Sequence, residues 1–99
     1  MIYFVRTGAV APGKGAHAFA FAQKIVKYWK TNFDKELELR RPIGGNPNRI
    51  AFVGRYKDLA EFDAVSQKSM ADKKYMELVS SAADLWIAGS LRDEIWRSA

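Results

Sequence analysis

His17 is the only histidine in the chain of 99 residues, and its imidazole is the first group that could do chemistry. An imidazole titrates near neutral pH and ligates metals, so His17 is a candidate general acid or base and a candidate haem ligand. It follows a Gly-rich loop near the start of an expected helix, where a side chain can face a cleft. No paired carboxylate or second ligand is evident, so an exposed position on a helix is the competing interpretation.

Three arginines, Arg6, Arg49 and Arg55, fall in segments that resemble strands. A guanidinium can bind a ligand carboxylate through two parallel hydrogen bonds, although cross-strand pairing with Glu36 or Glu38 explains these residues more simply. Two aromatic residues, Tyr56 and Trp86, could line a pocket for a flat or apolar ligand. Their competing interpretation is a place in the core or at a dimer interface.

The loops add weaker candidates. Asn46 could orient a substrate carbonyl, but Asn beside Gly and Pro ordinarily forms a turn. Gly13-Lys14-Gly15 lacks the spacing of a phosphate-binding loop. The chain has no cysteine, which excludes thiolate catalysis and cysteine-based zinc sites, and the sequence points to no metal and no cofactor. The catalytic candidates are His17 as acid or base, Arg55 for an oxyanion, and Tyr56; the ligand-binding candidates are Arg6, Asn46, Arg49 and Trp86.

The composition indicates one globular domain over residues 1–99. Hydrophobic residues make up 48% of the chain, an ordinary share, whereas 13% aromatic residues is high. No apolar run approaches the roughly 20 residues that span a bilayer. The net charge of +5 raises nucleic acid as a partner, but the basic residues are dispersed, which argues against it. The absence of cysteine suits a cytoplasmic location.

The candidate residues must be positioned by alternating strand and helix patterns in the order β-α-β-β-α-β. Strands are expected over residues 2–7, 35–41, 49–56 and 91–97, and helices over residues 19–32, 59–70 and 73–86. Gly, Pro and Asn between residues 41 and 49 predict a long hairpin loop. Asp58 and Glu61 form a capping-box pattern at the start of the second helix. A helical tail is the alternative for residues 91–97.

This order predicts an α+β, ferredoxin-like fold with a four-stranded antiparallel sheet whose second face is left uncovered. The third strand is apolar on both faces, with Ile50 and Phe52 on one and Ala51 and Val53 on the other. Either row would expose an apolar patch in a monomer. We therefore expect a homodimer in which two sheets pack face to face, with Phe52 as a candidate interface residue.

Two neighbouring segments also carry a family pattern. The first is the Pro/Gly/Asn hairpin at residues 41–48, and the second is a strand ending in Tyr followed by a helix opened by an Asp-Leu pair, at residues 52–61. Residues 72–75 and 89–95 are similar to the last helix and strand of the same family. These residues resemble the dimeric α+β barrel superfamily, and most of all its NIPSNAP-type domains. The resemblance implies a βαββαβ fold and a homodimer.

The resemblance implies diverse chemistry rather than one reaction. Members of the superfamily include cofactor-free monooxygenases acting on polyketides and quinones, haem-degrading enzymes and small isomerases, whereas NIPSNAP-like members mostly have no assigned reaction. No intact catalytic signature of one subfamily is present. The first hypothesis is a dimeric barrel protein without an assignable reaction, which binds a small hydrophobic or anionic metabolite between sheet and helices. The alternative is a cofactor-independent monooxygenase or isomerase acting on a small aromatic or polyketide-like substrate.

Overall fold

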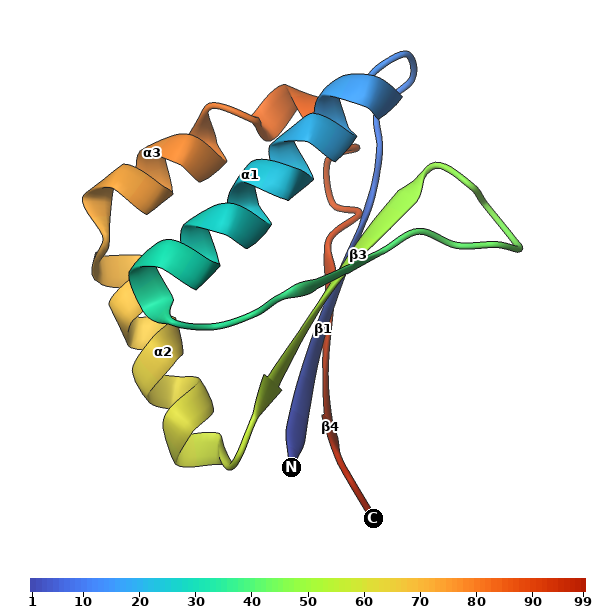
Figure 1. Cartoon of the computed structure of the whole chain (residues 1–99). Helices are drawn as coiled ribbons and strands as arrows, with labels where there is room; N and C mark the ends of the chain where they lie inside the picture. Colours follow the sequence, from blue (N-terminus) through green and yellow to red (C-terminus); the bar gives the residue numbers. More distant parts are fainter.

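The computed structural model describes residues 1–99 and has the expected βαββαβ order (Figure 1). The strands are β1 (Ile2–Ala9), β2 (Glu38–Arg40), β3 (Arg49–Tyr56) and β4 (Arg92–Arg97), and the helices are α1 (Gly15–Phe33), α2 (Leu59–Ala71), α3 (Lys73–Ser80) and the short 3-10 helix η1 (Ala83–Leu85). The strands form one antiparallel sheet in the order β2-β3-β1-β4. The predicted ferredoxin-like fold is therefore confirmed.

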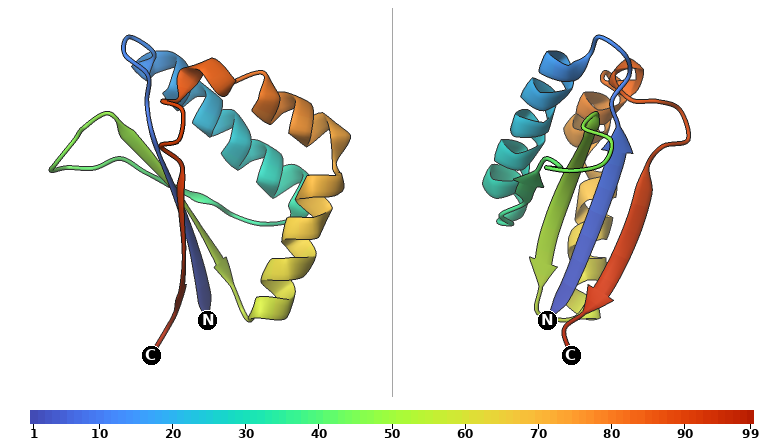
Figure 2. Two further views of the ribbon diagram at one scale, coloured as in Figure 1. Left: turned by 180° about the vertical axis from the view of Figure 1, so that it is seen from behind. Right: turned by 90° about the vertical axis from the view of Figure 1, so that its right-hand side faces the viewer.

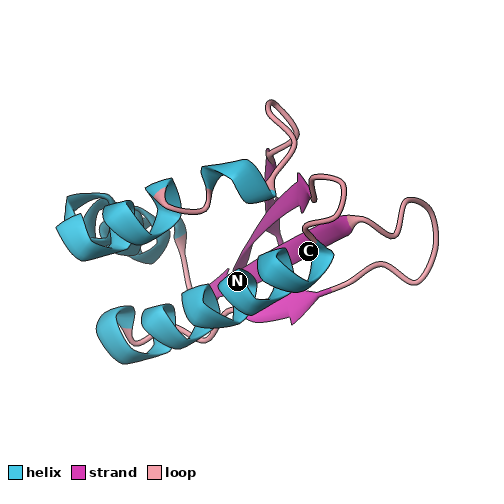
Figure 3. Ribbon diagram, turned by 90° about the horizontal axis from the view of Figure 1, so that it is seen from above, coloured by secondary structure: helices cyan, strands magenta, loops and turns pink.

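All helices lie on one side of the sheet, and the other side is bare (Figure 2). Seen from above, α1 runs along the sheet while α2 and α3 form a second row beside it (Figure 3). Residues directly opposite each other in an antiparallel pair share a face. The pairs Phe4–Gly54 and Arg6–Phe52 face the helices, whereas Val5–Val53 faces away. The row expected at a dimer interface is thus Ala51 and Val53, because Phe52 faces the helices.

Helix α1 is held against the sheet by small residues at helical spacing. Ala18 and Ala22 are fully buried and form a core cluster with Val10 and Ile50. Because alanine has almost no side chain beyond the backbone, the helix can approach the strands closely at this point. The helix begins at Gly15, earlier than predicted, and ends where Asp34 adopts a left-handed conformation with φ 52°.

The second strand is shorter than the predicted range 35–41. Only Glu38, Leu39 and Arg40 pair with β3, and the preceding Lys35 instead directs its side chain to Glu61 and to the carbonyl of Arg55. The hairpin loop that follows is exposed and projects beyond the sheet (Figure 1). Within it, the Asn46 side chain accepts a hydrogen bond from the backbone N–H of Asn48 at 2.9 Å. The Asn46 side chain therefore stabilises the turn in this loop.

Each of the two helices after β3 begins at an aspartate that caps it. The Asp58 carboxylate accepts a hydrogen bond from the N–H of Glu61 at 2.8 Å, which confirms the predicted cap of α2. Asp72 separates α2 from α3 and caps α3 by accepting from the N–H of Tyr75. The predicted helix over 73–86 is wrong beyond Ser80. Its last residues cannot stay helical because Leu85 and Ile87 form backbone hydrogen bonds with Ala11 and Ala9 beside β1.

The C-terminal segment is a strand and not a helical tail. Strand β4 pairs with β1 over six positions, from Ile2 opposite Arg97 to Thr7 opposite Arg92. Beyond it, Ser98 donates a backbone hydrogen bond to Met1, so both ends of the chain lie together (Figure 1). The pairing with β1 satisfies backbone groups that a helical tail would leave at an open sheet edge.

The close approach of α1 to the sheet leads to a first prediction. Ala22→Leu should lower the free energy of unfolding by about 1–3 kcal/mol, because the added atoms overfill a packed core. The matched control is Ala20→Leu on the exposed side of the same helix, which should change stability by less than about 0.5 kcal/mol. Urea denaturation measures both values. Equal stability of the two variants would contradict the packing described here.

Candidate ligand-binding cavity

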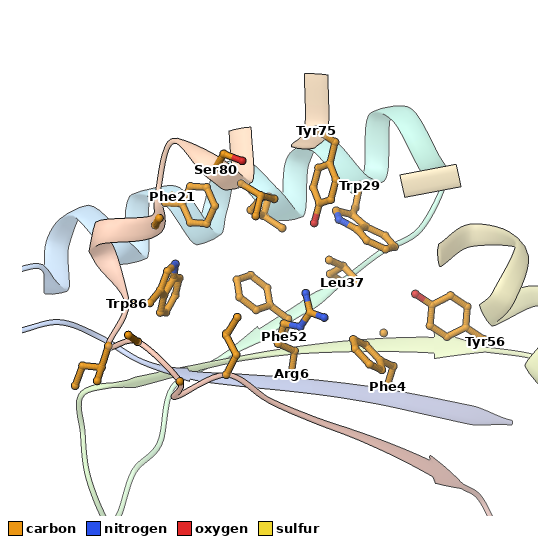
Figure 4. A pocket seen from close by; sticks show the side chains of 18 residues that line it. Phe4, Arg6, Phe21, Trp29, Leu37, Phe52, Tyr56, Tyr75, Ser80 and Trp86 are labelled. Carbon is orange, nitrogen blue, oxygen red and sulfur yellow. The ribbon is translucent and has the colours of Figure 1, made fainter. Parts of the chain in front are cut away.

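A cavity of about 500 Å³ lies between the helices and the sheet (Figure 4). Eighteen residues line it, and 14 of them are hydrophobic. Its floor comes from β1 and β3, its roof from α1 and α3, and one end from η1 and the segment after it. A volume in this range is typical of pockets for small organic molecules. The cavity is therefore the candidate functional site.

The floor is set by the alternation of β1 and β3. Phe4, Arg6, Phe52 and Tyr56 all point from the sheet toward the helices, and Gly54 lies among them. A Cβ at Gly54 would come within 3.2 Å of both the Leu37 side chain and the Tyr56 hydroxyl oxygen. The missing side chain at this position therefore leaves room for the Tyr56 ring.

The roof at the α2 end of the cavity is an aromatic cluster. Trp29 and Phe33 of α1 meet edge to face with ring centroids 5.0 Å apart, and Tyr75 of α3 lies edge-on to both of them. These contacts lock the rings in place. At the opposite end, Phe21 and Trp86 meet edge to face at 6.3 Å (Figure 4). The cavity thus has rigid aromatic walls at both ends.

Arg6 is the one charged residue that lines the cavity. Its Nε and one Nη donate to the two carboxylate oxygens of Asp93 at 2.7 and 2.8 Å, across the β1–β4 pairing. The hydrogen bonds from Arg6 hold the pKa of the Asp93 carboxyl below its ordinary value. Asp93 is therefore ionised at neutral pH, and the positive charge of Arg6 has a matching negative charge beside it.

Tyr56 supplies a hydroxyl from the floor. The residue is only 2% exposed, and its ring is held by an edge contact with Phe62 at 5.2 Å and by the Lys35 ammonium 4.7 Å from the ring centroid. Burial, with a smaller effect of the Glu61 carboxylate, raises the pKa of Tyr56 to about 12. The phenol is therefore protonated at neutral pH and acts as a hydrogen-bond donor rather than as a base.

The structure brings three of the seven candidate residues together. Arg6, Tyr56 and Trp86 line the cavity. His17 lies on the exposed side of α1, in a shallow depression beside Lys14 and Asp84. The remaining three candidates also lie outside the cavity: Asn46 in the hairpin loop, Arg49 and Arg55 on the bare face of the sheet.

The expected partners of the strand arginines are partly wrong. Arg6 pairs with Asp93 rather than with Glu36 or Glu38. Glu38 pairs with Arg40 two residues away, and Glu36 lies near Lys30. No pattern in the sequence indicates the Arg6–Asp93 pair, because the two residues are 87 positions apart and only the β1–β4 register sets them side by side.

Several cavity residues were not among the candidates. Trp29 and Phe21 line the cavity from α1, Tyr75 from α3, and Phe52 from the helix-covered face of β3. The high aromatic content was the available signal, since 13 aromatic residues exceed what a small core needs. A helical period identifies the inward side of α1 but does not say whether that side meets protein or a cavity.

The structure offers no group of three histidine, aspartate or glutamate side chains that could hold a metal ion. None of its helices combines the length and the apolar character that a membrane crossing requires. The cavity can pack against an apolar ligand and donate hydrogen bonds from its few polar groups.

Comparison with solved structures finds the same fold in proteins of low sequence identity. A NIPSNAP family protein of unknown function from Agrobacterium tumefaciens is 19% identical, with a TM-score of 0.83 over 100% of this chain and 88% of that one. An uncharacterised NIPSNAP domain protein from Burkholderia xenovorans is 17% identical, with a TM-score of 0.84 over 100% and 95%. No family model matches the chain, and no curated protein matches it.

A third similar structure widens the range of functions on this fold. A putative antibiotic biosynthesis monooxygenase from Deinococcus radiodurans is 10% identical, with a TM-score of 0.75 over 100% of this chain and 93% of that one. At these identities the likeness concerns the fold and leaves the reaction open. The chain has the α+β fold of NIPSNAP proteins and of antibiotic biosynthesis monooxygenases, as the hairpin and helix-cap segments predicted.

Proposed function

We propose that the protein is a homodimeric α+β barrel protein that binds a small hydrophobic metabolite in the cavity between its sheet and helices. The observation that carries this proposal is the lining of the cavity, in which 14 of 18 residues are hydrophobic. Burying apolar ligand surface against such walls is favourable by about 25 cal/mol per Å². Rigid aromatic walls also lower the entropic cost of binding, because few side chains must be ordered.

The rim of the cavity supports access from solvent. Val79, Ile87 and Leu91 line the cavity and are also exposed, with Leu91 58% exposed. Exposed apolar side chains around a hollow are a common feature of ligand entrances. The rim lies between α3 and the segment that leads into the edge strand β4. A small molecule could enter here without separating α1 from the sheet.

The cavity supports binding more directly than catalysis. A proton-transfer reaction needs an acid or base within hydrogen-bond reach of the substrate. His17, which we considered for this role, lies outside the cavity, and so does Arg55. Tyr56 is held protonated, and Arg6 is paired with Asp93. The oxygenase or isomerase alternative therefore lacks the specific observation that would favour it over binding.

The bare face of the sheet supports the homodimer. Its centre is an apolar strip made of Tyr3, Val5, Ala51, Val53 and Trp96, which the register of β1, β3 and β4 places on one face. Trp96 is 58% exposed in the single chain. Charged residues of β2 and β4 flank this strip. Two such faces packed together would bury it, and a two-fold dimer is the commonest closed arrangement. The single domain over residues 1–99 and the cytoplasmic location remain predictions from the sequence.

Filling the cavity from its rim tests the binding proposal. Ala83 lines the cavity from η1 and is exposed, so Ala83→Phe should place a ring in the cavity without disturbing the core. We expect roughly tenfold weaker binding of the neutral fluorescent probe N-phenyl-naphthylamine, equivalent to about 1.4 kcal/mol. Ala64→Phe, on the exposed side of α2, is the control and should bind like the unchanged protein. Equal binding by both variants would place the probe elsewhere, and no binding at all would refute the proposal.

Two adjacent residues of β4 test the dimer. Trp96 belongs to the bare face and Ile95 to the helix-covered face, and they are similarly exposed at 58% and 52%. Trp96→Asp should convert the dimer to a monomer, because it buries a charge in the apolar strip, whereas Ile95→Asp should leave the dimer intact. Sedimentation velocity measures the mass of each species. A monomeric unchanged protein, or a dimer disrupted only by Ile95→Asp, would contradict the proposed interface.

A further inference from the structure

The electrostatics of the cavity distinguish between a neutral and an anionic ligand. Arg6 is the only charged residue in the lining, and two of its three nitrogen atoms donate to Asp93. An anion bound to Arg6 would compete with a carboxylate that already occupies the favoured bidentate geometry. It would also lie near the negative charge of Asp93. The cavity therefore has no uncompensated positive charge with which to attract an anion.

One buried hydrogen-bond donor in the lining has no acceptor in the protein. The Nε1 atom of Trp29 is buried and has no hydrogen-bond partner. Tyr56 adds a hydroxyl from the floor of the cavity. An indole N–H can only donate, and the phenol remains protonated because burial raises its pKa to about 12. A buried donor without an acceptor is unfavourable, and a ligand that supplies the acceptor removes that cost.

The two donors belong to the same end of the cavity. Figure 4 shows Trp29 above and Tyr56 below the end nearer α2, while Phe21 and Trp86 enclose the opposite end. The Tyr56 hydroxyl points toward the interior of the cavity in this view. Trp29 and Tyr56 thus place two donors at one end, while the other end carries the Ser80 hydroxyl and the Trp86 indole N–H beside the Phe21 ring. A ligand that satisfies the buried Trp29 donor has an acceptor at the Trp29 end and an apolar body against the mostly hydrophobic lining.

We propose that the ligand is an uncharged molecule with an apolar body and a terminal carbonyl-type oxygen, and that this oxygen accepts hydrogen bonds from Tyr56 and Trp29. This inference rests on the proposed binding function and narrows it from a hydrophobic or anionic metabolite to a neutral one. The apolar body packs against Phe21 and Trp86. The Arg6–Asp93 pair acts as a specificity element, since it neutralises the one cation that could select an anion.

Three naphthalene probes of one shape test the proposal by fluorescence titration. Prodan carries a neutral propionyl ketone on a dimethylaminonaphthalene, and its two analogues replace the propionyl group by a propyl chain or by a carboxylate. We expect the ketone to bind roughly tenfold more tightly than the propyl analogue, because only the ketone accepts hydrogen bonds. The carboxylate should bind more weakly than both. Removing its charge from water costs free energy, and no unpaired cation in the cavity offsets that cost.

Variants then assign the effect to residues. Tyr56→Phe and Trp29→Phe keep a ring but remove a donor, and each should weaken ketone binding about five- to tenfold while changing propyl binding less than about twofold. The propyl analogue thereby reports whether a variant still has an intact cavity. Asp93→Asn leaves Arg6 without its counter-charge and should make the carboxylate bind more tightly than it does to the unchanged protein.

An NMR measurement tests the Trp29 donor in the unsubstituted protein, and a variant is needed only to assign the signal. The chain has three tryptophans, so a nitrogen–proton correlation spectrum contains three indole signals, and Trp29→Phe identifies one of them. The Trp29 signal should move downfield with the ketone and remain near its place with the propyl analogue. Such a shift reports a hydrogen bond and not mere proximity, because both probes present the same ring system.

Each contrary result has a distinct meaning. If the propyl analogue binds as tightly as the ketone, the donors are not used and the neutral-carbonyl proposal is wrong, while the binding function stands. If the carboxylate binds most tightly to the unchanged protein, the ligand is an anion and the role given to Asp93 is wrong. If none of the three probes binds, the proposed function fails together with this inference.

Discussion

The arrangement of the helices depends on one carboxylate, Asp72, at the break between α2 and α3. It accepts hydrogen bonds from the Tyr28 hydroxyl of α1 at 2.8 and 3.0 Å and from the backbone N–H of Tyr75 at 2.9 Å. The first contact ties the break to α1, and the second starts α3 in a new direction. These bonds lower the pKa of the Asp72 carboxyl, chiefly through the Tyr75 N–H. The ionised carboxylate thus fixes where α3 runs, and α3 supplies the roof of the cavity.

Tyr75 connects the Asp72 cap to the cavity. Tyr75 follows the cap directly and packs on Tyr28, Trp29 and Phe33 of α1. A continuous α2–α3 helix would have no capping turn to direct Tyr75 toward α1. Because α3 diverges from the sheet while α1 stays close to it through Ala18 and Ala22, space is left between the two layers. The cavity therefore exists because α3 lies farther from the sheet than α1 does.

The sheet divides its two faces between different tasks. On one face, Phe52 and Tyr56 line the cavity, and on the other, Val5 and Val53 lie in an apolar strip that no helix covers. A substitution on β3 therefore affects the helix-covered face when the residue number is even and the bare face when it is odd.

The sequence by itself determined the order of elements, the hairpin, the cap at Asp58 and the alternation of β3, because these features depend on neighbouring residues and on the periods of strand and helix. Only the tertiary structure decided which row of β3 faces the helices, since alternation separates two faces without saying which one is covered. It also decided that Arg6 meets Asp93 and that Trp29 lines a cavity rather than a filled core. Such contacts join residues far apart in the chain, and strand register and helix direction set them.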